Sequence, residues 1–560
     1  MRLALLLTLA ACCCAKKVVK QNFDVIRGDS AEDAVKFNRP KLVKRDDSTA
    51  EMVLINAQTF FMTNVTIGTP GQSMGVLVDT GSSDLWVQDV DNEYCDSTSD
   101  SSKRRVVDID AFEFDKRDDI GGGELGGYTE TVTGSSTADA SIPTFTSGCN
   151  KYGGLDTSKS KSFKKNDTID FAISYADSTA ASGYWAHDVV NVAGVDVKDL
   201  SFAVANVSNS SFGVLGIGLT GLEATYVGST ATSSNHYQYL NLPYKMAANG
   251  LINTPAYSVF LNTASSSEGS VLFGGVDHSK YTGSLETVAI INTYAGYVDS
   301  PIRLEITLSG LTIASGDNEE TLASGKFAAL LDTGSTITYL PLDLLEAIAN
   351  TIGASYSSSI GYYYFDCSIA NDYKFTFDFT GAKIQASLSN FTLVGQGFCA
   401  LGVSYSGDDS VILGDNFISN AYVVYDLENE QISIAQADFS GGSEDIEEID
   451  SSGVPSAVKA ASYSSTWTSD DDVSIATSVS LEATSNGGIV TASSGSAAST
   501  KSGSSGSSSK SSKSSSGSKT TSSSSSSSSS NTNSKSEGNS LKPTAMIAAV
   551  VLLMASAMAL

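Results

Sequence analysis

The sequence predicts a mostly β protein whose folded body consists of two related lobes. Between Met52 and about Ala437 the chain is rich in Val, Ile, Thr, Tyr, Phe and Gly, arranged in short alternating runs. One motif of apolar residues followed by Asp-Thr-Gly-Ser occurs twice in this stretch. A chain of 560 residues is also too long for a single core. We therefore expect an N-terminal lobe at 46–245 and a C-terminal lobe at 246–440.

Individual elements follow the same logic. The alternating runs Phe375–Phe379 and Tyr422–Asp426 predict strands, because apolar side chains recur at every second position. Only short helices are expected. One is Leu342–Asn350, a Leu- and Ala-rich stretch that Pro341 precedes.

The repeated motif relates the two lobes to each other. Its first copy runs from Gly75 to Trp86 and its second from Ala328 to Tyr339, an offset of 253 positions (332 minus 79). Downstream of each copy lies an apolar-apolar-Gly segment, at Val214–Gly216 and Ile412–Gly414. Each lobe should thus supply one buried strand, one Asp-Thr-Gly-Ser turn and one apolar segment.

The two turns carry the candidate catalytic residues Asp79 and Asp332. Each Asp ends an apolar strand, where a lone carboxylate is costly to ionise. Glycine permits the tight turn that follows, and the turn N–H groups and a Ser hydroxyl are the expected partners of each carboxylate. The supporting residues are Thr80, Gly81 and Ser82 in the first turn and Thr333, Gly334 and Ser335 in the second.

Two such carboxyl groups placed together would share one proton and activate a water molecule. The ionised member takes a proton from the water, and the neutral member donates one to a peptide carbonyl. This chemistry needs no cofactor and no metal, and it favours acid. The three histidines, His187, His236 and His278, are isolated from one another, and no His-Glu-x-x-His or Gly-x-Ser-x-Gly motif occurs.

On these motifs the chain resembles the pepsin-like aspartic peptidases over Phe60 to Gln436. The resemblance implies a bilobal β fold with a cleft, Asp79 and Asp332 as its catalytic pair, and a hairpin flap over the cleft. The match to the flap is Ile173–Thr179 followed by Gly183, so Tyr175 would be the flap tyrosine, bonded to Trp86. Ala176 departs from the pattern, because glycine is common there.

The N-terminus has the features of a secretory leader. Residues 1–15 predict a signal peptide: Arg2, a short apolar run, then small residues. Residues 16–45 predict a pro-segment, with nine basic residues against four acids and a dibasic end that Arg45 closes. The alternative is a solvated basic arm with a chance Lys-Arg pair.

Cysteines and sequons fit a secreted chain. Four cysteines remain after the signal peptide, which suggests two disulfides. Three connectivities are possible, and pairing of sequence neighbours is the simplest. Five Asn-x-Ser/Thr sequons are candidate glycosylation sites. The cysteines are Cys95, Cys149, Cys367 and Cys399, and the sequon residues are Asn64, Asn166, Asn206, Asn209 and Asn390.

An acidic insertion interrupts the N-terminal lobe at 96–148. It holds 11 acids against five basic residues, and its two basic clusters, one ending at Arg117, are candidate processing sites. If the loop is cut, a disulfide between Cys95 and Cys149 would keep the two chains joined. The alternative is an uncut flexible loop, and in either case we expect a monomer.

The C-terminal region predicts a tether. Serine dominates at 441–540, which suggests a disordered stalk because such a composition buries little apolar surface. Residues 541–560 are mostly apolar and follow small residues and a short polar spacer, the order of a GPI-attachment signal. A tail-anchoring transmembrane helix is the alternative. We expect secretion to the cell surface, with the GPI lipid at the plasma membrane or the cell wall.

This architecture is similar to the yapsins, fungal GPI-anchored aspartic peptidases, and the resemblance implies cleavage beside Lys or Arg. The formal net charge of −28 argues against nucleic acid and favours basic peptide or protein substrates. Asp177 on the flap would face a basic substrate side chain, unless it merely faces solvent. The expected function is an aspartic endopeptidase that processes proproteins or cell-surface proteins. The alternative is a catalytically inactive, wall-anchored binding protein on the same fold.

Overall fold

The computed structural model describes residues 17–24, 61–92, 152–175, 179–208, 210, 212–263, 268–358, 361–394, 399–481 and 496–498. Several predictions of the previous section lie outside these residues. They include the signal peptide, the insertion at 96–148, the GPI-signal tail and all of the Ser-rich stalk beyond 481 except 496–498. The individual residues concerned are Arg45, Cys95, Arg117, Cys149, Ala176, Asp177 and Asn209.

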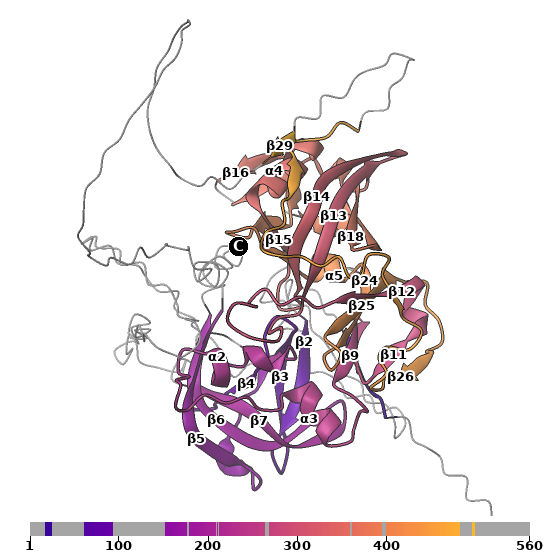
Figure 1. Cartoon of the computed structure of the whole chain (residues 1–560). Coiled ribbons are helices and arrows are strands. Elements are labelled where there is room, and N and C mark those ends of the chain that lie inside the picture. Colours follow the sequence, from indigo (N-terminus) through magenta and orange to yellow (C-terminus); the bar gives the residue numbers. More distant parts are fainter. Residues whose placement is uncertain are drawn as a thin grey trace, which may run out of the picture.

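The N-terminal lobe is built on one seven-stranded sheet (Figure 1). Its order is β2-β3-β8-β4-β7-β6-β5, and an additional pairing of β2 with β6 joins the first strand to the sixth. The strands are β2 (Met62–Ile67), β3 (Gln72–Asp79), β4 (Leu85–Gln88), β5 (Lys164–Ser174), β6 (Ala180–Val192), β7 (Val195–Ser208) and β8 (Gly213–Gly216).

A second seven-stranded sheet, which the sequence did not predict as a separate unit, combines strands from distant parts of the chain. Its order is β1-β10-β9-β24-β25-β12-β27. The edge strand β1 belongs to the predicted pro-segment and runs antiparallel to β10. The strands are β1 (Val19–Asp24), β9 (Ala256–Phe260), β10 (Glu268–Phe273), β12 (Tyr281–Ala289), β24 (Ala421–Asp426), β25 (Gln431–Ala437) and β27 (Val458–Lys459).

The C-terminal lobe contains the largest sheet, in the order β19-β18-β13-β14-β23-β15-β22, with β28 on β14 and β29 on β28. A small sheet, β16-β17-β21-β20, and the pair β11-β26 complete the strands of the described residues. The large sheet has β13 (Glu305–Ser315), β14 (Asn318–Leu331), β15 (Thr338–Leu340), β18 (Lys374–Phe379), β19 (Ala382–Ser387), β22 (Val403–Tyr405), β23 (Val411–Leu413), β28 (Ser474–Ala476) and β29 (Ser496–Ala498). The others are β11 (Gly275–Asp277), β16 (Ser355–Ser357), β17 (Tyr362–Phe365), β20 (Thr392–Val394), β21 (Cys399–Leu401) and β26 (Ile446–Glu448).

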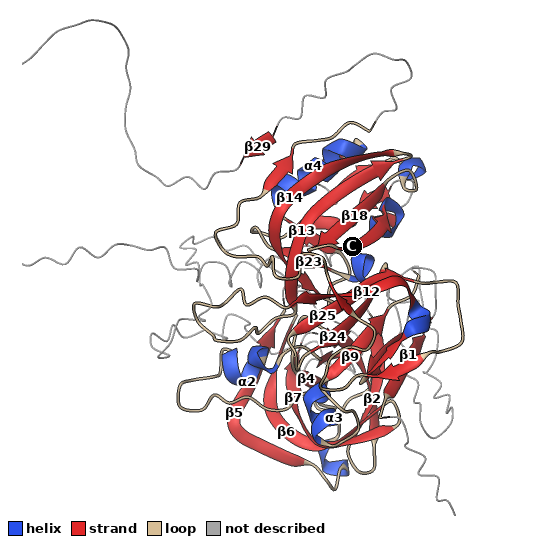
Figure 2. Ribbon diagram, turned by 45° about the vertical axis from the view of Figure 1, so that its right-hand side comes forward, coloured by secondary structure: helices blue, strands red, loops and turns tan. Residues whose placement is uncertain are grey.

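Helices are short and lie around the sheets (Figure 2). The predicted helix is present as α4, where Pro341 occupies the N-cap and Gly353, at φ 71°, ends the helix in the left-handed conformation. The α-helices are α2 (Ala224–Val227), α3 (Leu242–Ala248), α4 (Leu342–Ile352) and α5 (Asp415–Ile418). The 3-10 helices are η3 (Thr157–Lys159), η4 (Thr220–Leu222), η5 (His278–Lys280), η6 (Cys367–Ile369) and η7 (Leu388–Phe391). No helix among the described residues is long and apolar enough to cross a bilayer.

Alternation of apolar residues explains the strands at the core. In β18 the side chains of Phe375, Phe377 and Phe379 are buried, and the residues between them are more exposed. Phe417 of α5 packs against Phe377 and Phe379, with ring centroids 4.8 and 5.6 Å apart. The mostly β fold class and the strands predicted at 375–379 and 422–426 are thus confirmed.

Residues 441–481, which we call the strap, correct the predicted start of the disordered stalk. They run along the folded body, where β26 pairs with β11, β27 with β12, and β28 with β14. Ile449 and Ala460 are buried, and Val473 and Ile475 pack against the main core. The prediction of disorder rested on the average composition of the region, which is rich in serine. It gave no weight to these few apolar residues, whose burial accounts for the order of the segment.

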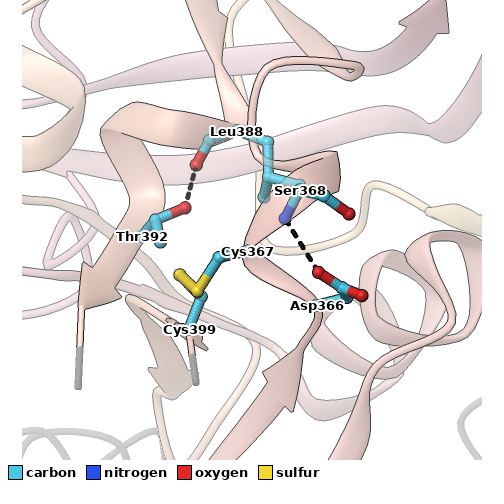
Figure 3. Close-up of a disulfide and its surroundings, with 6 residues drawn as sticks. All are labelled: Asp366, Cys367, Ser368, Leu388, Thr392 and Cys399. Carbon is cyan, nitrogen blue, oxygen red and sulfur yellow. Dashed lines mark hydrogen bonds between the residues drawn. A yellow bond between two sulfur atoms is a disulfide. The ribbon is translucent and has the colours of Figure 1, made fainter. Parts of the chain in front are cut away.

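One disulfide joins Cys367, in η6, to Cys399, in β21 (Figure 3). Asp366 caps η6 by accepting a hydrogen bond from the N–H of Ser368. This is the pairing of sequence neighbours that we considered simplest. It ties the small sheet to the segment that precedes β18.

Candidate active site

The two Asp-Thr-Gly-Ser turns stand at equivalent places in their lobes. Asp79 ends β3, which runs parallel to β8, and Asp79 pairs with Gly216 at the end of β8. Asp332 directly follows β14, which runs parallel to β23, and its N–H donates to Leu413 O at 3.0 Å. The sequence repeat therefore reflects a structural repeat, in which an apolar strand delivers each carboxyl group beside an apolar-apolar-Gly segment.

The turns face each other closely enough to bring both carboxyl groups into one site. A Cβ atom on Gly81 would lie 2.5 Å from Asp332 Oδ1, and one on Gly334 would lie 2.5 Å from Asp79 Oδ1. Each glycine thus stands over the aspartate of the other lobe, and a side chain at either position would displace it. The two carboxyl groups are also hydrogen-bonded to each other.

Two buried threonines, one in each turn, hold the two turns together by reciprocal hydrogen bonds. The N–H of Thr80 donates to Thr333 Oγ1 at 3.1 Å, and the N–H of Thr333 donates to Thr80 Oγ1 at 3.0 Å. Each hydroxyl in turn donates to a strand carbonyl of the opposite lobe, Thr80 to Leu331 O at 2.8 Å and Thr333 to Val78 O at 2.9 Å. All of these groups are buried, so the lobes are joined at the site without intervening solvent.

The serine that follows each turn behaves differently in the two lobes. Both carboxylates accept a turn N–H, from Gly81 at 2.7 Å and from Gly334 at 2.8 Å. Ser82 donates its hydroxyl to Asp79 Oδ2, as expected. Ser335, expected to do the same for Asp332, instead donates to Ile337 O at 3.0 Å. Asp79 therefore has one more hydrogen bond that stabilises its charged form.

Electrostatics follow from this asymmetry. Burial raises the pKa of Asp79, while the Ser82 hydroxyl and the Asp332 carboxyl lower it again by hydrogen bonding. Burial and the charge of Asp79 raise the pKa of Asp332 well above its usual range, and the Gly334 N–H and Arg303 oppose this only in part. Of the pair, Asp79 is the member that ionises first and Asp332 the member that keeps its proton.

Two further ionisable groups lie beside the pair, and our sequence reasoning missed their role. Asp415, in the first turn of α5, is buried, and burial and the charges of Asp332 and Asp79 raise its pKa well above the usual range. Arg303 is half-buried, lies 3.3 Å from Glu305 Oε1, and interacts electrostatically with Asp332. Asp415 directly follows the apolar-apolar-Gly segment Ile412–Gly414, and this position could have marked it as a neighbour of the pair. Nothing in the local sequence indicates a role for Arg303.

The predicted flap is a hairpin between β5 and β6. The N–H of Tyr175 donates to Thr179 O at 2.8 Å, one step beyond the last strand pair, Ser174 and Ala180, toward the tip of the hairpin. Trp86 donates its indole Nε1–H to the Tyr175 hydroxyl at 2.7 Å, so the flap tyrosine is held by the strand that follows the Asp79 turn. Asp177 lies between these residues in the sequence, outside the described ones.

The described sequons differ in their surroundings. Asn206 is exposed on β7, whereas Asn64 on β2 and Asn390 in η7 are half-buried. Asn166 on β5 donates its amide to the Tyr237 hydroxyl at 2.9 Å and accepts the N–H of Thr168. Within the described part of the chain, no three His, Cys, Asp or Glu side chains are grouped so that they could hold a metal ion.

A pair of buried carboxyl groups that share a proton at the junction of two β lobes defines the class of aspartic-type endopeptidases. Comparison with known proteins agrees. The family model for eukaryotic aspartyl proteases matches residues 60–437, and the chain belongs to that family. It is therefore an aspartic endopeptidase, a hydrolase.

Curated relatives cover most of the chain. Aspartic proteinase 3 of Saccharomyces cerevisiae is 45% identical over 513 residues, which cover 86% of this chain and 89% of the relative. Aspartic proteinase yapsin-3 of the same yeast is 41% identical, covering 76% of this chain and 75% of the relative. Secreted aspartic protease 9 of Candida albicans is 36% identical, covering 80% of this chain and 90% of the relative. Each of these matches covers more of the chain than the family model does.

Proposed function

We propose that Asp79 and Asp332 are the catalytic pair of this endopeptidase and that they activate one water molecule between them. The observation that carries the proposal is the reciprocal approach of the two turns. Each glycine lies over the opposite aspartate, and the two threonines hydrogen-bond across the junction. Two acids this close at a buried site are costly unless they share one proton, and a shared proton is what acid–base activation of a water molecule requires.

The asymmetry of the pair assigns the steps. Asp79, stabilised as an anion by Ser82 and Gly81, takes a proton from the water as that water attacks the peptide carbonyl carbon. Asp332, which keeps its proton, donates it to the carbonyl oxygen, and a neutral tetrahedral diol results. The proton now on Asp79 passes to the leaving nitrogen, while Asp332 recovers its proton from a diol hydroxyl as the C–N bond breaks. The pair then again holds one proton.

Residues around the pair have supporting roles in this proposal. Thr80 and Thr333 fix the distance between the lobes, and Gly81 and Gly334 leave room for the carboxyl groups and donate backbone N–H bonds. Tyr175, held by Trp86, closes the flap over the bound peptide and excludes water. In this scheme the Ser335 hydroxyl supports the backbone at Ile337 rather than the reaction itself.

The test of the proposal is peptide hydrolysis in acid by the purified ectodomain. We expect hydrolysis that pepstatin abolishes and that is lost when Asp79→Asn or Asp332→Asn is introduced. Hydrolysis that survives in the Asp79→Asn protein would exclude the two-aspartate mechanism.

We further propose that the enzyme prefers peptide bonds beside Lys or Arg. The support is the formal net charge of −28, which concentrates basic peptides near the surface, and Asp177 of the flap hairpin, which would pair with a basic substrate side chain. Cleavage-site profiling on a peptide library tests this, with Asp177→Asn compared with Asp167→Asn as a matched variant on the neighbouring strand. Cuts that do not gather at Lys or Arg would remove this preference and leave the peptidase activity untouched.

The proposed route is secretion, removal of residues 16–45 after Arg45, and attachment to a GPI lipid, with proproteins or cell-surface proteins as substrates. The support is the order of leader, dibasic end, Ser-rich stalk and apolar tail in the sequence. A relative that is 36% identical to this chain is itself named a secreted aspartic protease. Release of the protein from membranes by a phosphatidylinositol-specific phospholipase tests the anchor, because a transmembrane tail would resist that enzyme.

A further inference from the structure

A second pair of carboxyl groups lies behind the Asp79 turn, and the mechanism above makes no use of it. Asp84, in the segment that follows Ser82, is 1% exposed, and Glu223, which directly precedes α2, is 0% exposed. Burial raises the pKa of Asp84 to about 6. Burial, together with the charge of Asp84, raises the pKa of Glu223 to about 10. Both groups are therefore far from their ordinary acidity.

Hydrogen bonding gives the two acids different roles. Both oxygens of Asp84 accept a hydrogen bond, Oδ1 from the Tyr239 hydroxyl at 2.6 Å and Oδ2 from the Ala224 N–H at 2.8 Å. Glu223 accepts only one, at Oε2 from the Tyr239 N–H at 2.8 Å, while its buried Oε1 has no hydrogen-bond partner. A proton shared by this pair belongs on Glu223, because an ionised Oε1 would be left unsolvated.

The other ionisable groups that face this pair are phenols. Tyr239, Tyr237 and Tyr244 each interact electrostatically with Glu223, and burial is the main reason that the pKa of each is raised. Phenols with raised pKa values are neutral in acid and at neutral pH. The charge on the pair therefore changes only when Asp84 or Glu223 itself titrates.

An unbroken series of aromatic contacts connects this pair to the flap. The ring of Tyr239 lies 5.5 Å from that of Trp185, centroid to centroid, and Trp185 lies 5.4 Å from Phe171. Phe171 lies 6.3 Å from Trp86, which donates to the hydroxyl of the flap Tyr175. Asp84 and Trp86 are also only two positions apart in the chain. The segment that contains both is therefore held at Asp84 by the hydrogen bonds of the carboxyl pair and at Trp86 by the aromatic contacts.

We propose that Asp84 and Glu223 form a second carboxyl pair that positions the segment Ser82–Trp86, with Glu223 holding a proton and Asp84 accepting hydrogen bonds. Ser82 supports the catalytic Asp79, and Trp86 supports the flap. The pair thus acts on the reaction through both residues, as positioning residues that do not themselves touch substrate. The site uses the same physical device twice, a buried acid kept neutral beside a buried acid that accepts hydrogen bonds.

The chain carries its own probes for this pair. It has three tryptophans, of which Trp86 and Trp185 belong to the aromatic series and Trp467 lies in the strap. Trp467→Phe leaves only the two reporters. Asp79→Asn and Asp332→Asn in the same protein remove both the titration of the catalytic pair and self-digestion. Tryptophan fluorescence, followed from acid to neutral pH, should change with an apparent pKa near 6, as the Asp84 carboxyl ionises.

Two variants in this background test the assignment. Asp84→Asn should abolish the fluorescence change near pH 6, whereas Glu346→Gln, a change at an exposed position on α4, should leave it intact. Persistence of the full change in the Asp84→Asn protein would overturn the proposal. Infrared difference spectra at pH 7 should show a protonated carboxyl band that Glu223→Gln removes and Glu346→Gln retains. An unchanged band in the Glu223→Gln protein would show that Glu223 is not the proton holder.

Steady-state kinetics of the active enzyme test whether Asp84 and Glu223 position the segment Ser82–Trp86. Glu223→Gln keeps a neutral group of the same shape, so we expect kcat/KM within about twofold of the parent enzyme. Tyr239→Phe removes the hydroxyl that donates to Asp84, and we expect KM to rise about fivefold with little change in kcat, because flap support affects ground-state and transition-state binding alike. A loss above about tenfold in Glu223→Gln, or parental kinetics in Tyr239→Phe, would contradict the positioning role.

Discussion

The two Asp-Thr-Gly-Ser turns have the same sequence but differ in the residues that follow them. Asp84 and Trp86 follow the first turn, and Ile337 and Tyr339 stand at the matching positions after the second. Behind the first turn lies a buried acid pair, and the Ser82 hydroxyl of that turn donates to the Asp79 carboxylate. Behind the second, the serine bonds the Ile337 carbonyl. An identical motif therefore yields two unequal acids, because residues beyond the motif decide where its hydroxyl points.

The electrostatic surroundings differ in the same sense. Arg303 and Asp415 both interact with Asp332, whereas the Ser82 hydroxyl is the largest influence that lowers the pKa of Asp79. A local hydrogen bond is the largest influence that lowers the pKa of each acid, from the Ser82 hydroxyl for Asp79 and from the Gly334 N–H for Asp332, and Arg303 adds a charge that also lowers the pKa of Asp332. In the proposed mechanism, the Ser82 hydrogen bond suits Asp79 to act as the base, and the raised pKa of Asp332 suits Asp332 to act as the acid.

The largest effects should come from removing either carboxyl group. In Asp79→Asn and Asp332→Asn proteins we expect kcat to fall by about 10⁴-fold, because general acid–base catalysis is lost. The measurement is initial rates on a peptide substrate in acid, with retained pepstatin binding or thermal unfolding as evidence that the variants are folded. Residual activity within tenfold of the parent in either variant would break the assumed partnership.

The serines sharpen the comparison directly. Ser82→Ala should lower kcat/KM about 10- to 100-fold, because a hydrogen bond to a charged group is removed, and Ser335→Ala should stay within about threefold. The Ser82 hydroxyl lowers the pKa of Asp79, so its loss raises that pKa. The acid limb of the pH profile of kcat/KM should accordingly move to higher pH in Ser82→Ala only. Equal losses in the two variants would mean that the turns are equivalent.

The lobes also differ at their periphery, because the strap lies along the C-terminal lobe and the second seven-stranded sheet, β1-β10-β9-β24-β25-β12-β27, which we call the middle sheet. A chain that ends after Ser440 exposes the edges of β11 and β12 and the site of buried Ile449. Its midpoint of thermal unfolding should be at least about 5 °C below that of a chain that ends after Leu481. Calorimetry of the two proteins provides the measurement. Identical midpoints would mean that the strap contributes nothing to the catalytic unit.

The smallest expected effect concerns the charge beside Asp332. Arg303 lowers the pKa of Asp332, so Arg303→Gln should raise it and let Asp332 keep its proton to higher pH. The alkaline limb of the pH profile of kcat/KM should then move to higher pH, and Arg303→Lys, which keeps the positive charge, should give the parental profile. Glu305→Gln is combined with Arg303→Gln, so that no buried carboxylate is left unpaired. A limb that moves to lower pH would reverse the sign of this interaction.

Most of the fold and the candidate pair could be predicted from sequence because both rest on local patterns. Alternating apolar residues predict strands such as β18, and the duplicated Asp-Thr-Gly-Ser turn predicts two lobes with one aspartate each, Asp79 and Asp332. The middle sheet could not be predicted this way. It brings β1, β10 and β24 together from three distant stretches, and no local pattern encodes such a pairing.

The missed residues share a physical reason. Arg303 is remote from both turns in the sequence, and only tertiary packing brings it near enough to Asp332 for their charges to interact. Ser335 has the expected position in its motif, yet its hydroxyl finds a carbonyl two residues away. The strap was mistaken for stalk because composition averages over many serines, while a few apolar side chains such as Ile449 and Ile475 decide whether a segment packs.

If the chain is anchored as proposed, the strap determines where a force on the stalk enters the folded body. Its strand β28 pairs with Ala323 and Ser324 of β14, the strand that ends at the threshold of Asp332. Any pull exerted from the cell surface along the stalk would reach the body at this point. The load would enter the C-terminal lobe through β14, the strand that leads to Asp332, and would reach the N-terminal lobe with its flap only through the junction between the lobes.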